Sequence, residues 1–180
     1  MIFFGHVGIT TAVVKSYENF VTHKKNNKYT PTIDYRLVMI GSLLPDIIDK
    51  PIGAYFFRNT FHNSRIFCHS LLFSIGLMIL GSYYFYRRKN NNVFLLGVCS
   101  FIHQILDSMW LYPGIFYWPI YGWKFPTRPE GHWVANDIVR LLTDPYVYMP
   151  EIVGAIIIAY YFTKLVAKGK FREFIRYGRL

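Results

Sequence analysis

Six ionisable side chains lie inside or beside apolar stretches of this sequence, and their types could together bind a metal ion. They come from four separate segments: His6, Asp46, Asp49, His69, His103 and Asp107. Titratable groups in apolar segments are costly, and they usually pair with one another or serve a function. Neutral imidazoles and ionised carboxylates suit zinc or a similar divalent ion, whose charge offsets the cost of burying the aspartates.

The spacing of His103 and Asp107 supports a shared ligand site. They stand at i and i+4, which places both side chains on one helix face, about 6 Å apart at Cβ. Alternatives remain open, because an isolated His6 or His103 is often a satisfied core or interfacial histidine. Asp46, which follows a proline, could simply end a helix, and Asp49 could pair with a neighbouring lysine or arginine. Histidine–aspartate pairing in a metal-free proton relay is a further alternative.

Three more polar residues are candidates for the same site. Arg65 stands one turn before His69 and could hold a phosphate or an anionic headgroup by a bidentate contact. The alternative is an interfacial arginine whose guanidinium reaches water. His132 and Asp137 lie in a later loop, where they could be further ligands or exposed polar residues.

The elements that must position these residues are expected to be membrane helices. The chain has 180 residues, of which 53% are hydrophobic and 19% are aromatic, so it is more apolar than an ordinary soluble domain. The apolar runs 66–86, 93–118 and 147–167 are each long enough to cross about 30 Å of hydrocarbon as a helix. Shorter runs at 2–14 and 37–45 are expected to be two further spans or re-entrant helices.

These runs predict an all-α integral membrane bundle of about five transmembrane or partly re-entrant helices, forming a single domain over residues 1–180. Lysines and arginines in short loops mark the cytoplasmic side, and here they follow the first, third and fifth apolar runs. We therefore expect the amino terminus outside and a basic cytoplasmic tail from about Lys164. In this orientation the six ionisable side chains share one depth at the extracytoplasmic face.

The net charge of +10 is expected to serve contact with membrane lipids. The basic residues stand in blocks beside apolar segments, which is typical of membrane anchoring. We therefore expect no nucleic-acid partner.

Taken in order, the motifs resemble those of a known family. They are Gly5-His6, then Ser42-Leu43-Leu44-Pro45-Asp46, then Cys68-His69-Ser70-Leu71-Leu72, and then His103-Gln104-Ile105-Leu106-Asp107. Over roughly residues 1–126, their order and spacing resemble the membrane-bound, YdjM-like metal-dependent hydrolases, also labelled LexA-binding inner-membrane-associated hydrolases. That family is in turn distantly similar to zinc-dependent phospholipase C, an all-helical fold.

The resemblance implies a set of ligands for one or two divalent ions, with zinc as the expected metal. One ion would be bound by Asp46, His69, His103 and Asp107. A second would be held by His6, with Asp107 as the bridging carboxylate.

The chain departs from the family pattern in two places. The family usually has Pro-Asp-Ile-Asp, whereas this chain has Pro45-Asp46-Ile47-Ile48-Asp49, which shifts the helical phase of Asp49. The family also tends to show His-Arg ahead of a Thr-His-Ser triplet, and here Ser64-Arg65 and Cys68-His69-Ser70 stand instead. Asp49 is therefore a candidate general base, and Arg65 is a second catalytic candidate.

The leading hypothesis is a membrane-bound metal-dependent hydrolase that cleaves a phosphoester of a lipid or lipid-linked amphiphile at the extracytoplasmic face. One rival is a transporter that relays protons or metal ions, although a transport pathway needs polar groups across the whole bilayer. Another is a non-catalytic structural or regulatory membrane protein that binds metal and an unidentified protein partner. Stable metal binding without turnover of any ester would distinguish this last class.

Overall fold

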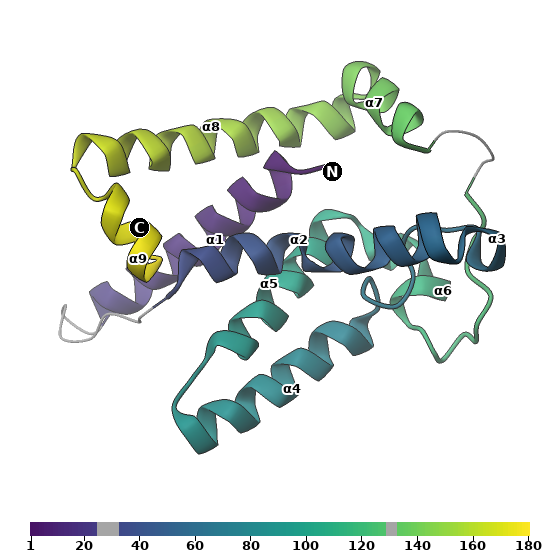
Figure 1. Cartoon of the computed structure of the whole chain (residues 1–180), viewed down its shortest axis with the longest axis horizontal. Coiled ribbons are helices and arrows are strands. Elements are labelled where there is room, and N and C mark those ends of the chain that lie inside the picture. The colour runs from purple at the N-terminus through teal and green to yellow at the C-terminus, as the bar shows by residue number, and fades with distance from the viewer. Residues whose placement is uncertain (25–32, 129–132) are drawn as a thin grey trace.

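The computed structural model describes residues 1–24, 33–128 and 133–180, and these residues form helices joined by loops (Figure 1). The longer elements are α1 (Phe4–Lys24), α2 (Tyr35–Pro51), α4 (Leu71–Arg88), α5 (Asn92–Leu106), α7 (Trp133–Thr143) and α8 (Pro145–Ala167). The shorter ones are the π-helical turn η1 (Ile52–Phe56), α3 (Arg58–Phe61), the 3₁₀ turn η2 (Met109–Leu111), α6 (Pro113–Phe116) and α9 (Phe171–Tyr177). The described residues thus confirm the predicted all-α class.

Local sequence accounts for where several helices begin. The carboxylate of Asp34 accepts a hydrogen bond from the backbone N–H of Arg36 and so caps α2. Ser70 caps α4 through the N–H of Phe73. Asp144 caps α8, and the proline that follows it occupies the first helical position, where its missing N–H costs nothing.

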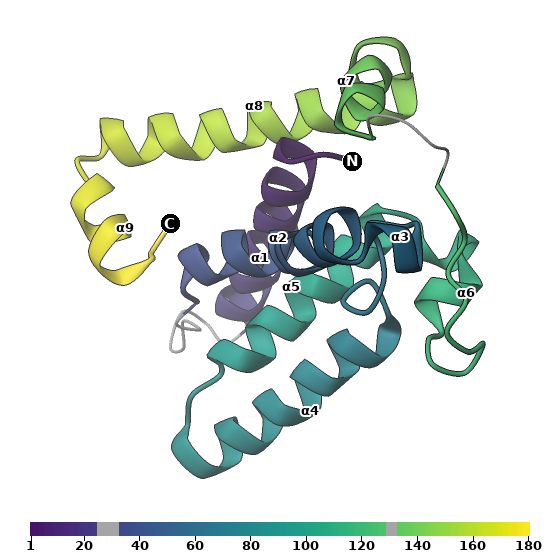
Figure 2. The ribbon, with the colours of Figure 1, turned by 45° about the vertical axis from the view of Figure 1, so that its right-hand side comes forward.

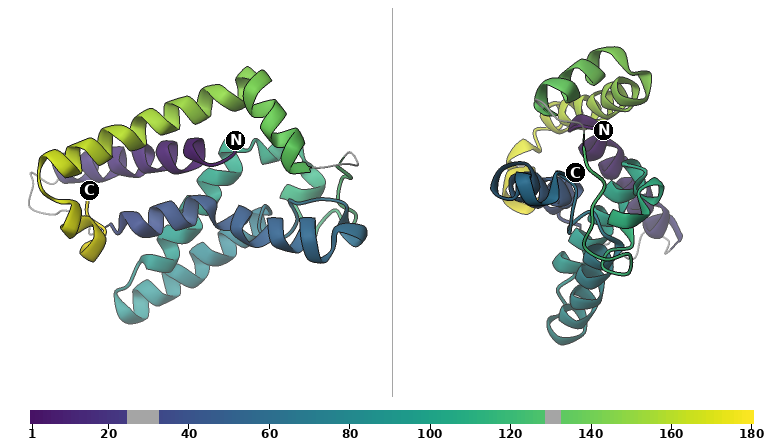
Figure 3. Two further views of the ribbon diagram at one scale, coloured as in Figure 1. Left: turned by 45° about the horizontal axis from the view of Figure 1, so that its top comes forward. Right: turned by 90° about the vertical axis from the view of Figure 1, so that its right-hand side faces the viewer.

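Two helix pairs and a crossing helix build the molecule. Helices α1 and α8 lie side by side and run in the same direction, while α4 and α5 form an antiparallel hairpin (Figure 1 and Figure 3). Helix α2 packs against both α1 and α5 and so joins the two pairs. Figure 2 shows the hairpin extending to one side of α2 and α8 lying on the other.

The packed core is small, and large apolar side chains cover much of the outer surface. One buried cluster, around Ile66 and Met109, fills the space near η2 and α6. Another, around Tyr35 and Val38, lies where α1, α2 and α5 meet. Side chains such as Ile79 on α4 and Ile156 on α8 are exposed. Exposed apolar faces of this extent are typical of a membrane-facing surface.

Among the described residues, one helix is long and apolar enough to cross a membrane. It is α8, with 23 residues, of which few are buried by the rest of the chain. Helix α5 is apolar but has only 15 residues. The run 93–118 is therefore not the single span that was predicted, because α5 ends at Leu106 and the chain turns at Ser108, whose φ is +54°. The run 37–45 lies within α2, and the run 2–14 overlaps the longer α1, which begins at Phe4.

Candidate metal centre

The fold brings all six predicted histidines and aspartates to one place. His6 comes from the first turn of α1, Asp46 and Asp49 from the end of α2, and His69 from the loop before α4. His103 lies in the last turn of α5, and Asp107 follows that helix. The residues are buried, with 0% exposure for the three histidines and Asp49. The structure thus brings together the six residues that the sequence predicted to lie at one membrane depth.

The donor atoms that all lie within 4.8 Å of one another form two groups that share His103: His6, Asp46 and His103, and His69, His103 and Asp107. His69 Nε2 lies 3.4 Å from both His103 Nε2 and Asp46 Oδ1. His103 Nε2 lies 3.9 Å from Asp107 Oδ2 and 4.0 Å from Asp46 Oδ1. Ligands about 2.0–2.1 Å from a tetrahedral metal stand about 3.4 Å from one another. The four printed separations, 3.4–4.0 Å, therefore equal or slightly exceed the spacing between the ligands of a tetrahedral metal.

The partners of the two central imidazoles determine which ring nitrogen carries a proton. His103 Nδ1 lies 2.7 Å from the backbone carbonyl oxygen of Ser42, which can only accept, so Nδ1 is the donor. His69 Nδ1 lies 2.7 Å from Asp49 Oδ2, and the same argument applies to the ionised carboxylate. With Nδ1 as the donor, each Nε2 atom can bind a cation, and the two Nε2 atoms face each other at 3.4 Å.

Asp49 has its carboxylate fully engaged. Besides the His69 ring, it accepts hydrogen bonds from the backbone N–H groups of Ile66, Cys68 and His69, at 2.9–3.1 Å. Both carboxylate oxygens of Asp49 therefore have hydrogen-bond partners, as a buried polar group requires. Its contacts orient His69 and fix the loop that carries it.

The two oxygens of Asp107 face different partners. Oδ1 lies 3.2 Å from His6 Nε2 and 3.0 Å from the α-amino group of Met1. Oδ2 lies 2.7 Å from Arg65 Nη2 and faces His103. The His6 ring stacks on the His103 ring at a centroid distance of 3.9 Å, yet neither of its nitrogens makes a hydrogen bond. This geometry suits a carboxylate that bridges two cations, with His6 available to the second.

Three supporting contacts were not predicted from the sequence. Lys50 Nζ lies 2.7 Å from Asp46 Oδ2, an i,i+4 pair whose spacing was visible in the sequence. Gln104 donates to the carbonyls of Cys68 and Ser70 and ties the His69 loop to α5. The sequence could not indicate the role of the Ser42 backbone carbonyl, because every residue type has a backbone carbonyl. The expected alternative, Asp49 paired with Lys50 or an arginine, is not the pairing that forms.

Asp137, which the sequence placed in a loop, lies in α7 and makes no printed contact with the cluster. Asp137 pairs with Arg128 at 3.0 Å in a neighbouring cavity. His132 lies outside the described residues. Solvent can approach the cluster through a cavity of about 470 Å³, whose lining includes Asp107, Lys50 and Arg65.

Comparison with known proteins identifies the family. No curated protein and no solved structure matches the chain, so the distant similarity to zinc-dependent phospholipase C stays a prediction. The model of the YdjM inner membrane protein family matches residues 1–171, which confirms the resemblance noted in the sequence and the expected membrane location. The chain therefore belongs to the YdjM inner membrane protein family.

Proposed function

We propose that the protein is a membrane-bound metal-dependent hydrolase that cleaves a phosphoester of a lipid or lipid-linked amphiphile at the extracytoplasmic face. The observation that carries the proposal is the pair of Nε2 atoms of His69 and His103, which face each other at 3.4 Å with carboxylate oxygens of Asp46 and Asp107 beside them. Two nitrogen and two oxygen donors suit zinc or a similar divalent ion. When bound, such an ion acidifies a water molecule and polarises a phosphoryl oxygen.

The protein's own residues have separate tasks in this proposal. Asp49 and the Ser42 carbonyl hold the two imidazoles in the ligating tautomer. This positioning role replaces the general-base role suggested for Asp49 by the sequence, because its oxygens already accept several hydrogen bonds at 0% exposure. Arg65, which is one-third exposed and 2.7 Å from Asp107, is placed to bind a phosphoryl oxygen beside the cluster.

A second ion is part of the proposal. His6 would hold it together with Asp107, whose Oδ1 faces the His6 ring. His6 is fully buried, and its Nε2 contacts Asp107 Oδ1 at 3.2 Å, whereas its Nδ1 has no hydrogen-bond partner, which is costly in a buried polar group.

The membrane arrangement that we propose keeps five helices in the bilayer or partly re-entrant, with the amino terminus outside. Apolar side chains exposed on α4 and α8 support it, since water would disfavour both faces. The cluster lies at the ends of its helices, where α2 and α5 finish and α1 and α4 begin, as a site at headgroup depth requires.

Metal content tests this function most directly. Protein purified in detergent from metal-replete cells is compared with a His103→Ala, Asp107→Ala double variant by plasma mass spectrometry. The control is His23→Ala, Glu173→Ala, which removes an exposed histidine and an exposed carboxylate. We expect at least one equivalent of a divalent metal in the wild type and the control, and none in the cluster variant. We also expect the proteins that contain metal to hydrolyse phospholipid esters and the metal-free variant not to.

The opposite result would shift the function to another class. A metal-free wild type would leave the two Nε2 atoms to share a proton, as in a proton-relaying transporter. Metal without turnover of any ester would favour a structural or regulatory protein.

A further inference from the structure

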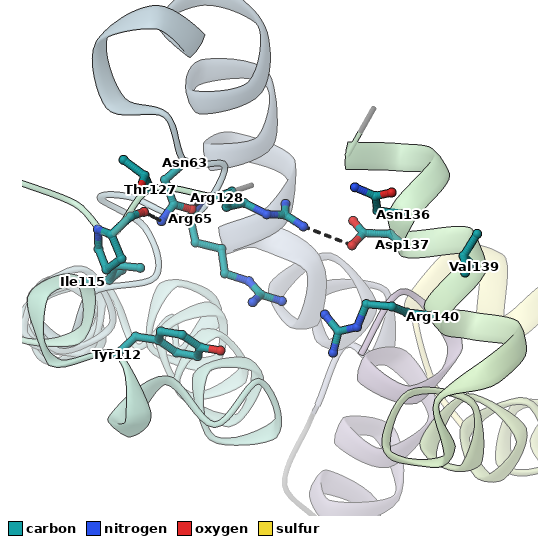
Figure 4. Close-up of a pocket in the computed structure, with 11 residues that line it drawn as sticks. Asn63, Arg65, Tyr112, Ile115, Thr127, Arg128, Asn136, Asp137, Val139 and Arg140 are labelled. Atoms are coloured by element: carbon teal, nitrogen blue, oxygen red, sulfur yellow. Dashed lines mark hydrogen bonds and ion pairs between the residues drawn. The ribbon is translucent and has the colours of Figure 1, made fainter. Parts of the chain in front are cut away.

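A cavity lined by arginines lies beside the candidate metal centre (Figure 4). It has a volume of about 500 Å³, and its polar lining includes Arg65, Arg128, Arg140, Asn63 and Tyr112. It adjoins the cavity of about 470 Å³ that reaches Asp107, and the two share all three arginines. Helix α7 and the loop after α6 therefore place Arg140 and Arg128 near the cluster, although neither segment supplies one of its histidines or aspartates.

Among the described residues, the linings of the two cavities carry more cationic than acidic side chains, although Lys50 pairs with Asp46 and Arg140 with Asp144 outside these linings. The linings of the two cavities contain four cationic side chains, Lys50, Arg65, Arg128 and Arg140, against two carboxylates, Asp107 and Asp137. The carboxylate of Asp137 accepts from Arg128, and that of Asp107 faces the metal cluster and Arg65.

Arg140 is the cation with the weakest pairing in its geometry. Its Nη2 lies 3.4 Å from Asp144 Oδ2, a long contact between partly exposed side chains. Figure 4 shows the guanidinium groups of Arg65 and Arg140 pointing toward one another across the cavity, with the Tyr112 ring to the left of both. Two like charges facing each other repel unless an anion lies between them.

We propose that this cavity binds a phosphate group, held by Arg65 and Arg140 with Arg128 beside them. Guanidinium groups bind phosphate oxygens in a bidentate manner, and several around one cavity favour a group with more than one negative charge. Arg128 is positioned by Ser64 Oγ at 2.6 Å and by Asp137 at 3.0 Å. The phosphate can belong to a soluble phosphoester or to a lipid headgroup.

The surroundings of the cavity provide a place for an apolar chain on such a ligand. Its extension toward α8 is lined by Ile2, Ile9, Leu111, Val147 and Pro150. An amphiphile would thus place its phosphate between the arginines and its chain along the apolar helix. The identity of the cavity ligand as the substrate rests on the proposed hydrolase function, whereas phosphate binding itself does not.

Isothermal titration tests the site with two probes, inorganic phosphate and dihexanoyl phosphatidic acid. The protein is in a maltoside detergent and is treated with EDTA, so that any bound metal is removed. The variants are Arg140→Gln, Arg140→Lys and the control Arg88→Gln, which removes an exposed arginine at the end of α4.

We expect saturable binding to the wild type, unchanged in Arg88→Gln and at least about tenfold weaker in Arg140→Gln. Arg140→Lys should recover only part of the affinity, because an ammonium cannot make the bidentate contact. Tighter binding of the short-chain lipid identifies a headgroup site, and equal affinities identify a site for phosphate alone. Absence of binding by the wild type, or equal binding by Arg140→Gln, overturns the proposal.

The two proposals fail separately in these experiments. A protein that carries metal but binds neither probe refutes the arginine site alone. A protein that binds phosphate after EDTA treatment but never contains metal refutes the hydrolase alone.

Discussion

At the scale of single residues, Asp49 decides how well His69 can act as a ligand. In the wild type, both carboxylate oxygens of Asp49 accept hydrogen bonds from the surrounding N–H groups. An asparagine would replace one of these acceptor oxygens with an NH₂ donor, which cannot pair with an N–H group. We expect Asp49→Asn to weaken divalent metal binding by about 10–100-fold, the usual effect of losing the acceptor behind a ligating histidine. Competition with a chromophoric chelator measures the affinity.

The matched control for this change is Asp144→Asn. Asp144 caps α8, and asparagine caps a helix about as well as aspartate, so this variant should bind metal like the wild type. Wild-type affinity in Asp49→Asn would contradict the orienting role.

The sequence predicted which residues meet but not what each one does. The sequence alone shows that ionisable residues lie in or beside apolar segments, where burying them is costly unless they share a site. These residues are His6, Asp46, His69, His103 and Asp107. The role of Asp49 depends on the path of the loop before α4, whose backbone N–H groups it accepts. No pattern of side-chain types encodes that path.

At the scale of helices, Gly154 sets how closely α8 approaches α1. A Cβ atom built on Gly154 would overlap the backbone carbonyl of Phe4, which cannot move without shifting α1 and the His6 that it carries. We expect Gly154→Ala to destabilise the protein by about 1–3 kcal/mol, the usual cost of overpacking a close contact. The unfolding midpoint in detergent measures the change.

Gly76 provides the comparison, because a Cβ there meets nothing within 4 Å. Alanine favours a helix over glycine by about 0.8–1.0 kcal/mol, so Gly76→Ala should leave stability unchanged or raise it. Equal stability of the two alanine variants would show that α1 and α8 do not pack as closely as described.

The start of α2 should respond to pH through its capping aspartate. The hydrogen bond from the Arg36 side chain lowers the pKa of Asp34 below its ordinary value of 3.8. The stabilisation that Asp34 contributes is therefore present above about pH 4 and is lost as the pH falls through the lower, folded-state pKa. Asp34→Ala should cost about 1 kcal/mol at pH 7. That difference should shrink at pH 2 in thermal unfolding, and a pH-independent difference would contradict it.

The apolar runs predicted the longer apolar helices, whereas they predicted neither the ends of those helices nor the existence of α7 and α9. The run 93–118 is apolar enough for one span, yet α5 ends at Leu106, since Ser108 adopts a left-handed conformation and Pro113 begins a new short helix. The apolar content of a run indicates how favourably it enters a membrane, but it does not show where the backbone turns, as it does at Ser108. This break places Asp107 at the end of its helix, where both oxygens can reach partners from α1 and the Arg65 loop.

At the scale of the whole molecule, the position of the cluster predicts from which side of the membrane a substrate of the proposed hydrolase would approach. The loop between α4 and α5 and the region after α8 are rich in lysine and arginine, whereas the cluster lies at the opposite ends of α4 and α5. Basic segments remain on the cytoplasmic side of the membrane. The candidate metal centre and the arginine cavity should then face outward.

Reporter fusions test this orientation. Fusions at Asn91 and after Leu180 should give a cytoplasmic signal, while a fusion at Gly122, in the loop between α6 and α7, should give an external one, because that loop lies on the side of the cluster. Gly122 is a suitable insertion point, since nothing lies within 4 Å of a Cβ built there. An external signal at Asn91 together with a cytoplasmic signal at Gly122 would show that the protein has the opposite orientation in the membrane. The phosphoester would then have to come from the cytoplasmic leaflet, although the cluster and its chemistry would be unchanged.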